Sequence, residues 1–131
     1  MYAGISSATK SARAGNNLEG LKFRIVNLTG TEDFVDLTAA GLAYGVLVND
    51  PRSGEHASVA FADETKVQVG TGGLAVGQFF TSAATGFAVG VASGAATARL
   101  FGRHVGAVAV TSGGIARVLL ERWTSQSGQA L

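Results

Sequence analysis

The chain contains no cysteine, one proline and few charged residues, since Asp, Glu, Lys and Arg make up 15% of its 131 positions. The absence of cysteine excludes disulfides, thiolate metal sites and thiol nucleophiles, so packing or oligomerisation must supply the stability. A protein made in a reducing cytosol fits this composition. A formal net charge of +1 argues against general binding of nucleic acid.

Glycine, in contrast, is abundant, with nineteen residues spaced closely along the chain. This spacing suits tight turns between short strands and leaves room for a helix only near residues 37–43 or 74–76. A chain of this length forms one domain with one modest core. We therefore expect a mainly β domain, a small β-barrel or β-sandwich, over residues 21–123. Apolar or alternating stretches predict strands near residues 21–28, 34–37, 42–48, 57–61, 66–69, 76–81, 87–92 and 97–103.

One segment of the sequence occurs twice. Residues 45–61 form an apolar strand, a Ser53-Gly54 turn and a returning strand, and residues 106–120 repeat this pattern around Ser112-Gly113. In this alignment, Pro51-Arg52 has no counterpart in the second copy. Both turn glycines can adopt the positive φ angles that such turns require. Two equivalent hairpins predict internal pseudo-symmetry, which is a property of a scaffold rather than of a catalytic site.

The first twenty residues are small and polar, and Tyr2, Ile5 and Leu18 are their large apolar side chains. Such a segment cannot bury enough surface to hold itself in place. We therefore expect residues 1–20 to form an extended, flexible arm that becomes ordered on a partner. The arm lacks the continuous apolar stretch of a secretory signal. At the other end, residues 124–131 are expected to form a frayed tail.

Two motifs resemble catalytic or binding sites but have simpler interpretations. Residues 70–75 have a loose dinucleotide-binding spacing, but strand-like sequence follows, and no ribose-binding carboxylate lies about 20 residues later. The two histidines, His56 and His104, lack the neighbours of a catalytic triad or a metal site. We therefore expect no catalytic, cofactor or metal site, and interpret both histidines as structural or surface residues.

A membrane helix is an alternative interpretation of residues 74–98. This stretch carries no charge, is long enough to cross a bilayer, and places Gly86, Gly90 and Gly94 at GxxxG spacing. Its apolar character comes largely from alanine and glycine, and each glycine weakens a helix by up to about 1 kcal/mol relative to alanine. Polar side chains also interrupt it. Strands are therefore favoured over a membrane helix.

Three runs in the second half share short, glycine-based motifs with a known family: residues 75–89 (AVGQFFTSAATGFAV), 103–110 (RHVGAVAV) and 113–121 (GGIARVLLE). They resemble the capsid cement, or head decoration, proteins of tailed bacteriophages. Those proteins typically show a G-D-x-L-T-S-D-x-x-G-x-A turn, a G-x-A-L strand and a final G-x-x-x-V-x-L strand. The resemblance covers residues 42–121. Gln78 stands where aspartate is usual, Phe79-Phe80 replaces a smaller pair, and residues 1–38 have no counterpart.

The resemblance implies a structural virion protein without enzymatic activity. It would be made in the host cytoplasm and bind the outer surface of the expanded capsid, often as a homotrimer, without nucleic acid or membrane as a partner. There it would clamp neighbouring major capsid protein subunits against genome pressure, with the arm adding a strand to an exposed sheet edge. The alternatives are another β-rich virion component, such as a tail or baseplate subunit, and a small glycine-zipper membrane protein.

On this hypothesis, the arm contacts the capsid through its larger side chains, Tyr2, Ile5, Arg13 and Leu18. The trimer or capsid interface would use aromatic and basic residues of the second half: Phe79, Phe80, Phe87, Arg99, Arg103, Arg122 and Trp123. Phe79 and Phe80 point to opposite faces of a strand, so one can fill the core while the other reaches an interface. Trp123 either anchors an interface or caps the barrel.

The basic residues of the second half give a further expectation, because no acidic residue occurs between Glu64 and Glu121. Arg99, Arg103 and Arg117 all lie in this acid-free stretch. They either form a positive face that is attracted to an acidic capsid surface, or are paired across strands with acidic residues of the first half.

Overall fold

The computed structural model describes residues 7–29, 34–37, 44–91 and 99–124. A 3-10 turn, η1 (Ala84–Gly86), lies between the sixth and seventh of the nine strands in this part of the chain. The mainly β class and the small barrel expected from the sequence are confirmed. The strands are β1 (Ser7–Ala14), β2 (Ile25–Leu28), β3 (Phe34–Leu37), β4 (Gly45–Leu47), β5 (His56–Gln68), β6 (Phe79–Ser82), β7 (Ala88–Gly90), β8 (Arg99–His104) and β9 (Ile115–Thr124).

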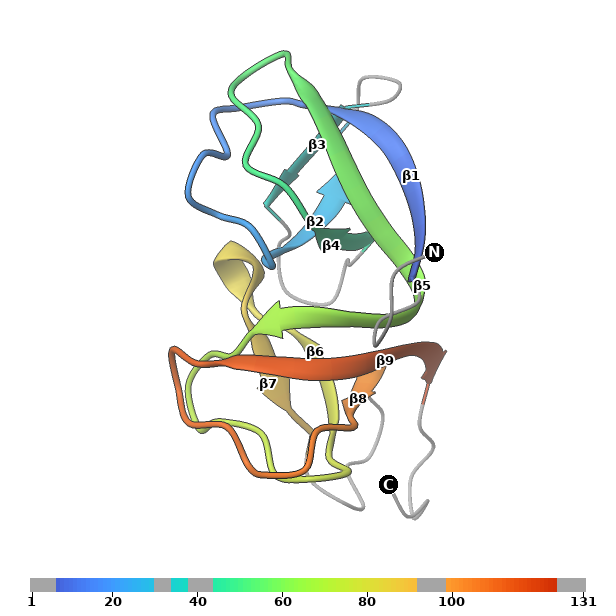
Figure 1. The fold of residues 1–131 in the computed structure, drawn as a ribbon, viewed down its shortest axis with the longest axis vertical. Coiled ribbons are helices and arrows are strands. Elements are labelled where there is room, and N and C mark those ends of the chain that lie inside the picture. Colours follow the sequence, from blue (N-terminus) through green and yellow to red (C-terminus); the bar gives the residue numbers. More distant parts are fainter. Residues whose placement is uncertain (1–6, 30–33, 38–43, 92–98, 125–131) are drawn as a thin grey trace.

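The strands form two barrels that share β5, one above the other in Figure 1. In the first barrel (residues 7–62), β1 pairs in parallel with β3 and antiparallel with β5, which closes the order β1-β3-β2-β4-β5. In the second barrel (residues 63–124), the end of β5 pairs with β9, and the sheet continues through β8 and β6 to β7. A parallel bridge from Ala88 to Val69 returns β7 to the end of β5. Between the barrels β5 passes through Asp63, whose φ is 62°.

The two barrels repeat the same strand order and the same backbone hydrogen bonds. Four backbone hydrogen bonds of the first barrel have a counterpart in the second. With the residue that donates its N–H named first, they are Gly15–Val35 and Gly70–Ala88, Ala14–Glu55 and Val69–Gly114, Leu47–Arg24 and His104–Gln78, and Val48–Ser58 and Val105–Arg117. Their N···O distances lie between 2.7 and 3.0 Å. The chain is therefore a tandem repeat of one five-stranded barrel, in which β5 ends the first copy and begins the second.

The repeated hairpin predicted from the sequence is confirmed at its turns and corrected in its incoming strand. Gly54 and Gly113 have φ angles of 80° and 88°. The incoming strand of the second copy is β8, whereas residues 106–110 lie in the loop before β9. Gly45 of β4 pairs with Val26 of β2, and Gly102 of β8 pairs with Phe80 of β6. Because β2 and β6 are equivalent strands of the two barrels, Gly102 is the counterpart of Gly45. The second loop is therefore two residues longer than the first, the opposite of the alignment expected from the sequence.

Each barrel has its own hydrophobic core. Ile25, Val46 and Ala60 belong to the first barrel by sequence but join the core of the second, because they point out of the first barrel toward it. The core of the first barrel consists of Ala12, Ala14, Leu18, Val26, Val35, Leu47, Ala57 and Val59. The core of the second adds Val67, Val69, Leu74, Phe80, Ala88, Phe101, Ala116, Val118 and Leu120 to those three residues.

Arg24 joins the two barrels. Its guanidinium lies 3.8 Å from the ring centroid of Phe87, and it donates hydrogen bonds to Oε1 of Gln68 (2.7 Å) and to the carbonyl oxygen of Thr85 (3.0 Å). Partial burial lowers the pKa of Arg24 by desolvation. All three contacts lie in the second barrel, so Arg24 fixes the first barrel against it.

Residues 7–20 belong to the first barrel, so the flexible arm expected over residues 1–20 is corrected for this part. β1 pairs with β5 from Ser7 to Arg13, and Leu18 is 1% exposed in the core. The strand was hidden in the composition because its inward residues, Ala12 and Ala14, are as small as those of a loop. Residues 1–6 and the expected tail at 125–131 lie outside the described residues.

The membrane-helix alternative is wrong for residues 74–91, which form a loop, β6, η1 and β7. No helix within the described ranges is long and apolar enough to cross a bilayer. The helix considered at residues 74–76 is not formed either, and most of the other position considered, residues 38–43, lies outside the described part.

Candidate interaction surfaces

Strand register brings four side chains of the second barrel into one line across its outer face. Glu64 of β5 pairs with Leu119 of β9, Leu119 pairs with Arg103 of β8, and Arg103 pairs with Phe79 of β6. Directly paired residues project from the same face of a sheet. Arg103 is exposed, and the other three are half-buried. We call this line the outer row; it combines aromatic, aliphatic and charged groups at the surface.

A second, shorter line of basic residues runs beside the outer row. Lys66 of β5 pairs with Arg117 of β9, and both side chains are exposed. Nε of Arg117 lies 3.3 Å from Oε2 of Glu64. Strand pairing therefore sets Glu64 of the neighbouring strand β5 beside Arg117. This agrees with the second of the two expectations from the sequence, in which the arginines are paired with acidic residues of the first half. Among the side chains that the structure describes, the outer face of the second barrel thus carries three basic residues, Lys66, Arg103 and Arg117, beside Glu64.

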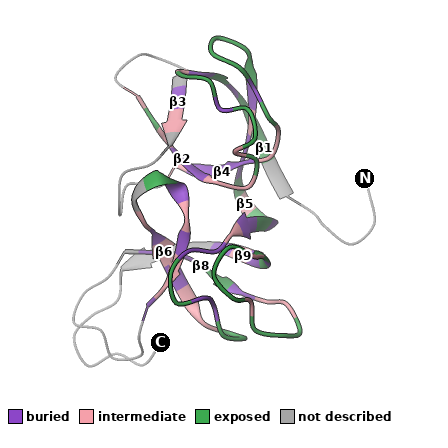
Figure 2. Ribbon diagram, turned by 90° about the vertical axis from the view of Figure 1, so that its left-hand side faces the viewer, coloured by how far each residue is buried: buried purple, intermediate pink, exposed green. Residues whose placement is uncertain are grey.

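The free end of the second barrel is uncharged. It consists of the loops at residues 70–78 and 105–114, which contain no charged side chain. Val76 and Val108 are 56% and 71% exposed there. Besides Arg24, which is engaged at the junction of the barrels, the equivalent loops of the first barrel carry five charged residues: Glu19, Lys22, Asp50, Arg52 and Glu55. Figure 2 shows the loops at both free ends as largely exposed, so the same architecture presents a charged end and an uncharged end.

His104 organises the uncharged end from inside the barrel. It is 1% exposed and occupies the core position that Leu47 fills in the first barrel. Its Nδ1 accepts the N–H of Gly106 (3.2 Å) and lies 3.1 Å from the carbonyl oxygen of Arg117. Its Nε2 donates to the carbonyl oxygen of Val108 (2.6 Å). The imidazole therefore holds the longer second loop in place, as the sequence-based structural interpretation of this residue expected.

Replacing His104 with leucine tests this role, because leucine is the native residue at the equivalent position. The loop would lose its contacts to the ring, and the free energy of unfolding is expected to fall by about 1–3 kcal/mol. Hydrogen exchange at the Gly106 amide is expected to accelerate. His56→Leu is the control, since His56 is exposed and contacts Oγ of Ser58 at the surface. Unchanged exchange at Gly106 in His104→Leu would contradict the role.

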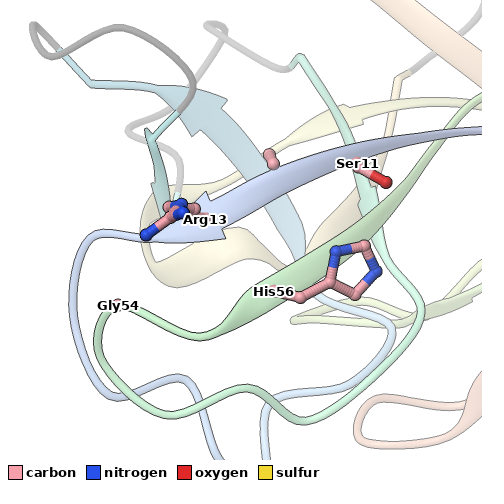
Figure 3. Close-up of a pocket in the computed structure, with 5 residues that line it drawn as sticks. Ser11, Arg13, Gly54 and His56 are labelled. Carbon is pink, nitrogen blue, oxygen red and sulfur yellow. The ribbon is translucent and has the colours of Figure 1, made fainter.

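A shallow depression lies on the first barrel where β1 meets the start of β5 (Figure 3). Its volume is about 440 Å³, and Ser11, Ala12, Arg13, Gly54 and His56 line it. Arg13 pairs directly with His56 across the two strands. The depression is open, and its polar side chains are exposed to solvent. Among the described residues, no group of three or more His, Asp or Glu side chains gathers as a potential metal site.

The residues that the sequence predicts as contacts lie in different parts of the structure, and some of them are buried. Phe80 is fully buried and Leu18 nearly so, which corrects their assignment to an interface, because neither reaches the surface. Phe87 stacks on Arg24 at the junction of the barrels. Phe79 and Phe80 point to opposite faces, as expected, and Phe79 joins Arg103 in the outer row. Tyr2 and Ile5, and the side chains of Arg99, Arg122 and Trp123, lie outside the described part of the structure.

Sequence reasoning missed Leu119 and Lys66 on the outer face, and Val76 and Val108 at the uncharged end. The two outer-face residues are identified by strand register, which the sequence does not supply. The uncharged end does have a signal in the sequence, because residues 74–98 carry no charge, but the same property is also typical of a membrane helix.

The sequence matches no protein-family model and no curated protein sequence. Among solved structures, the chain is similar to the crystal structure of the N base of head fiber gp8.5 in bacteriophage phi29. The TM-score is 0.67 at 20% sequence identity, and the similarity covers 88% of this chain and 95% of that chain. At this level of identity the similarity establishes a common fold.

Proposed function

We propose that this chain is a non-enzymatic structural protein of a bacteriophage virion that binds the outer surface of the head as a homotrimer and clamps neighbouring major capsid protein subunits. The observation that carries the proposal is the fold, which matches the base of a phage head fibre over 95% of that chain. The resemblance of residues 42–121 to capsid cement proteins supports the same location.

The uncharged end of the second barrel is the surface we assign to the capsid contact. The central parts of protein interfaces are depleted of charge and enriched in apolar groups. Val76 and Val108 provide such groups, and His104 holds the loop that carries Val108. The charged end of the first barrel then points away from the shell. This assignment replaces the contact expected from Leu18, which lies in the core; for residues 1–6 the contact remains a prediction.

Co-sedimentation with expanded, undecorated phage heads tests the proposal. Purified protein is titrated onto heads, and the bound amount is measured per major capsid subunit. Saturation at a fixed ratio is expected, and Val108→Asp is expected to weaken binding because it would bury a carboxylate in the contact. Leu28→Asp is the matched control, because Leu28 is 50% exposed and belongs to β2 of the first barrel, not to the loops of the uncharged end. Folded protein that does not bind heads would refute the proposal.

A head-bound base without a clamping role is a second candidate, because the similar solved structure is the base of a fibre. The thermal stability of the heads separates the two functions. A clamp adds contacts between capsid subunits, so saturated heads are expected to disassemble at a higher temperature than undecorated heads. Binding without any change in that temperature would favour the second candidate.

A further inference from the structure

We propose that the outer row of the second barrel binds a second copy of this chain, whose first barrel lies on the row as the second barrel lies on the first within one chain. This contact would join the copies of the homotrimer in the proposed function, and the proposal rests on that function in this respect. Association between copies is measured without heads, so a failure to associate can be distinguished from a failure to bind heads.

The basis is that the outer row has an exact structural counterpart in the first barrel. Strand register there pairs Thr9 with Ala60, Ala60 with Val46, and Val46 with Ile25. These pairs join β1, β5, β4 and β2 in the same way as the outer row joins β5, β9, β8 and β6. The two rows are therefore the same surface of the repeated unit.

In the first barrel this surface is already an interface between barrels. Ile25, Val46 and Ala60 are fully buried and belong to the core of the second barrel. The 3-10 turn η1 of the second barrel lies against β2 in this row, because a Cβ added to Gly86 would lie 2.5 Å from the carbonyl oxygen of Ile25. The repeated unit thus uses this row to hold a neighbouring barrel.

In the second barrel the same row lies at the surface of the chain. Phe79 stands where the first barrel has Ile25, Leu119 where it has Ala60, and Arg103 where it has Val46. Phe79 and Leu119 are half-buried, so further apolar area is available to a partner, and Arg103 adds a charge at the centre. Aromatic residues, including phenylalanine, and arginine are enriched at protein interfaces relative to the rest of the surface.

The charges of the two halves identify the first barrel of another copy as the occupant. Residues 1–62 contain six acidic and five basic residues, a net charge of −1, whereas residues 63–131 contain three acidic and five basic residues, a net charge of +2. A contact between unlike barrels brings opposite net charges together, whereas a contact between two second barrels would oppose like charges. Such head-to-tail contacts close into rings when the rotation between copies allows it.

Sedimentation equilibrium of the purified chain, without heads, tests the proposal. The wild-type chain is expected to self-associate, and Arg103→Glu is expected to weaken the association by about tenfold or more through charge reversal in the contact. Arg52→Glu makes the same charge change at the exposed end of the first barrel, which already carries the opposite net charge, and is therefore not expected to weaken the association. A wild-type chain that stays monomeric, or equal weakening by the two variants, would overturn the proposal.

Cysteine labelling gives a second readout that does not reverse a charge. The chain has no cysteine, so Leu119→Cys introduces a single thiol in the outer row, and Ser112→Cys introduces one in an exposed loop. With the protein in excess over the label, the apparent second-order rate constant for maleimide labelling of the outer-row thiol is expected to fall as the protein concentration rises, while that of the loop thiol stays the same. Second-order rate constants that do not change with concentration at either position would contradict the contact.

Discussion

Replacing Phe80 with alanine is expected to lower the free energy of unfolding by about 3–5 kcal/mol. The side chain is fully buried in the core of the second barrel and meets Phe101 edge to face, with ring centroids 5.9 Å apart and an interplanar angle of 83°. Truncation removes this contact and leaves a cavity that the surrounding strands cannot close, because the barrel fixes their spacing. Denaturant unfolding followed by circular dichroism measures the loss.

The matched control is Phe79→Ala, because Phe79 precedes Phe80 on the same strand and points to the opposite face. It is half-buried in the outer row. Its truncation is expected to cost about 1 kcal/mol or less of monomer stability, measured at a protein concentration too low for association. Equal losses for the two variants would contradict the placement of the two rings.

Replacing Gly102 with alanine is also expected to have a large effect and to lower the free energy of unfolding by about 3 kcal/mol or more. A Cβ at this position would lie 2.3 Å from the carbonyl oxygen of Leu119 and 3.0 Å from the ring of Phe80. The backbone oxygen cannot move without breaking the pairing of β8 with β9. Gly45 meets the same constraint in the first barrel, where a Cβ would lie 2.6 Å from the carbonyl oxygen of Ala60, the counterpart of Leu119.

The comparison for Gly102→Ala is Gly113→Ala, which separates steric contact from backbone conformation. A Cβ on Gly113 would meet no described atom within 4 Å, but its φ of 88° is unfavourable for a residue with a side chain. The expected cost is about 1 kcal/mol. Thermal unfolding of the two variants side by side checks this order, and a larger loss for Gly113→Ala would show that the close packing of Gly102 was misjudged.

The repeated hairpin could be predicted in part because its turns depend on local chemistry. A Ser-Gly turn with positive φ is readable from two residues, and both copies have it. The pairing of the incoming strand is not local. Residues 106–110 alternate small and apolar side chains as a strand does, but the buried His104 holds them in a loop, and β8 takes the pairing instead.

The first strand and the outer row could not be predicted for a related reason. β1 has the composition of a loop, and its place in the barrel depends on β3 and β5, which are distant in the sequence. Likewise, Phe79 and Arg103 could be chosen individually by residue type. Their alignment with Leu119 follows from the register of three strands, which no spacing within one segment encodes.

The two barrels show how one repeated unit can present different surfaces. Their backbones make equivalent hydrogen bonds, and Gly45 and Gly102 occupy equivalent close-packed positions, so the fold requires glycine at the same place in both barrels. Their surfaces differ, because the end loops of the first barrel are charged and those of the second are not. The proposed function uses this difference, since it gives the uncharged end to the shell and leaves the outer row to a neighbouring copy.

Attachment to the head is tested by cryo-electron microscopy of expanded, undecorated phage heads incubated with saturating protein, with heads alone as the reference. We expect extra density outside the shell that fits the two-barrel body, with the uncharged end of the second barrel against major capsid subunits. Reconstructions that are identical with and without the folded protein would contradict attachment to the head.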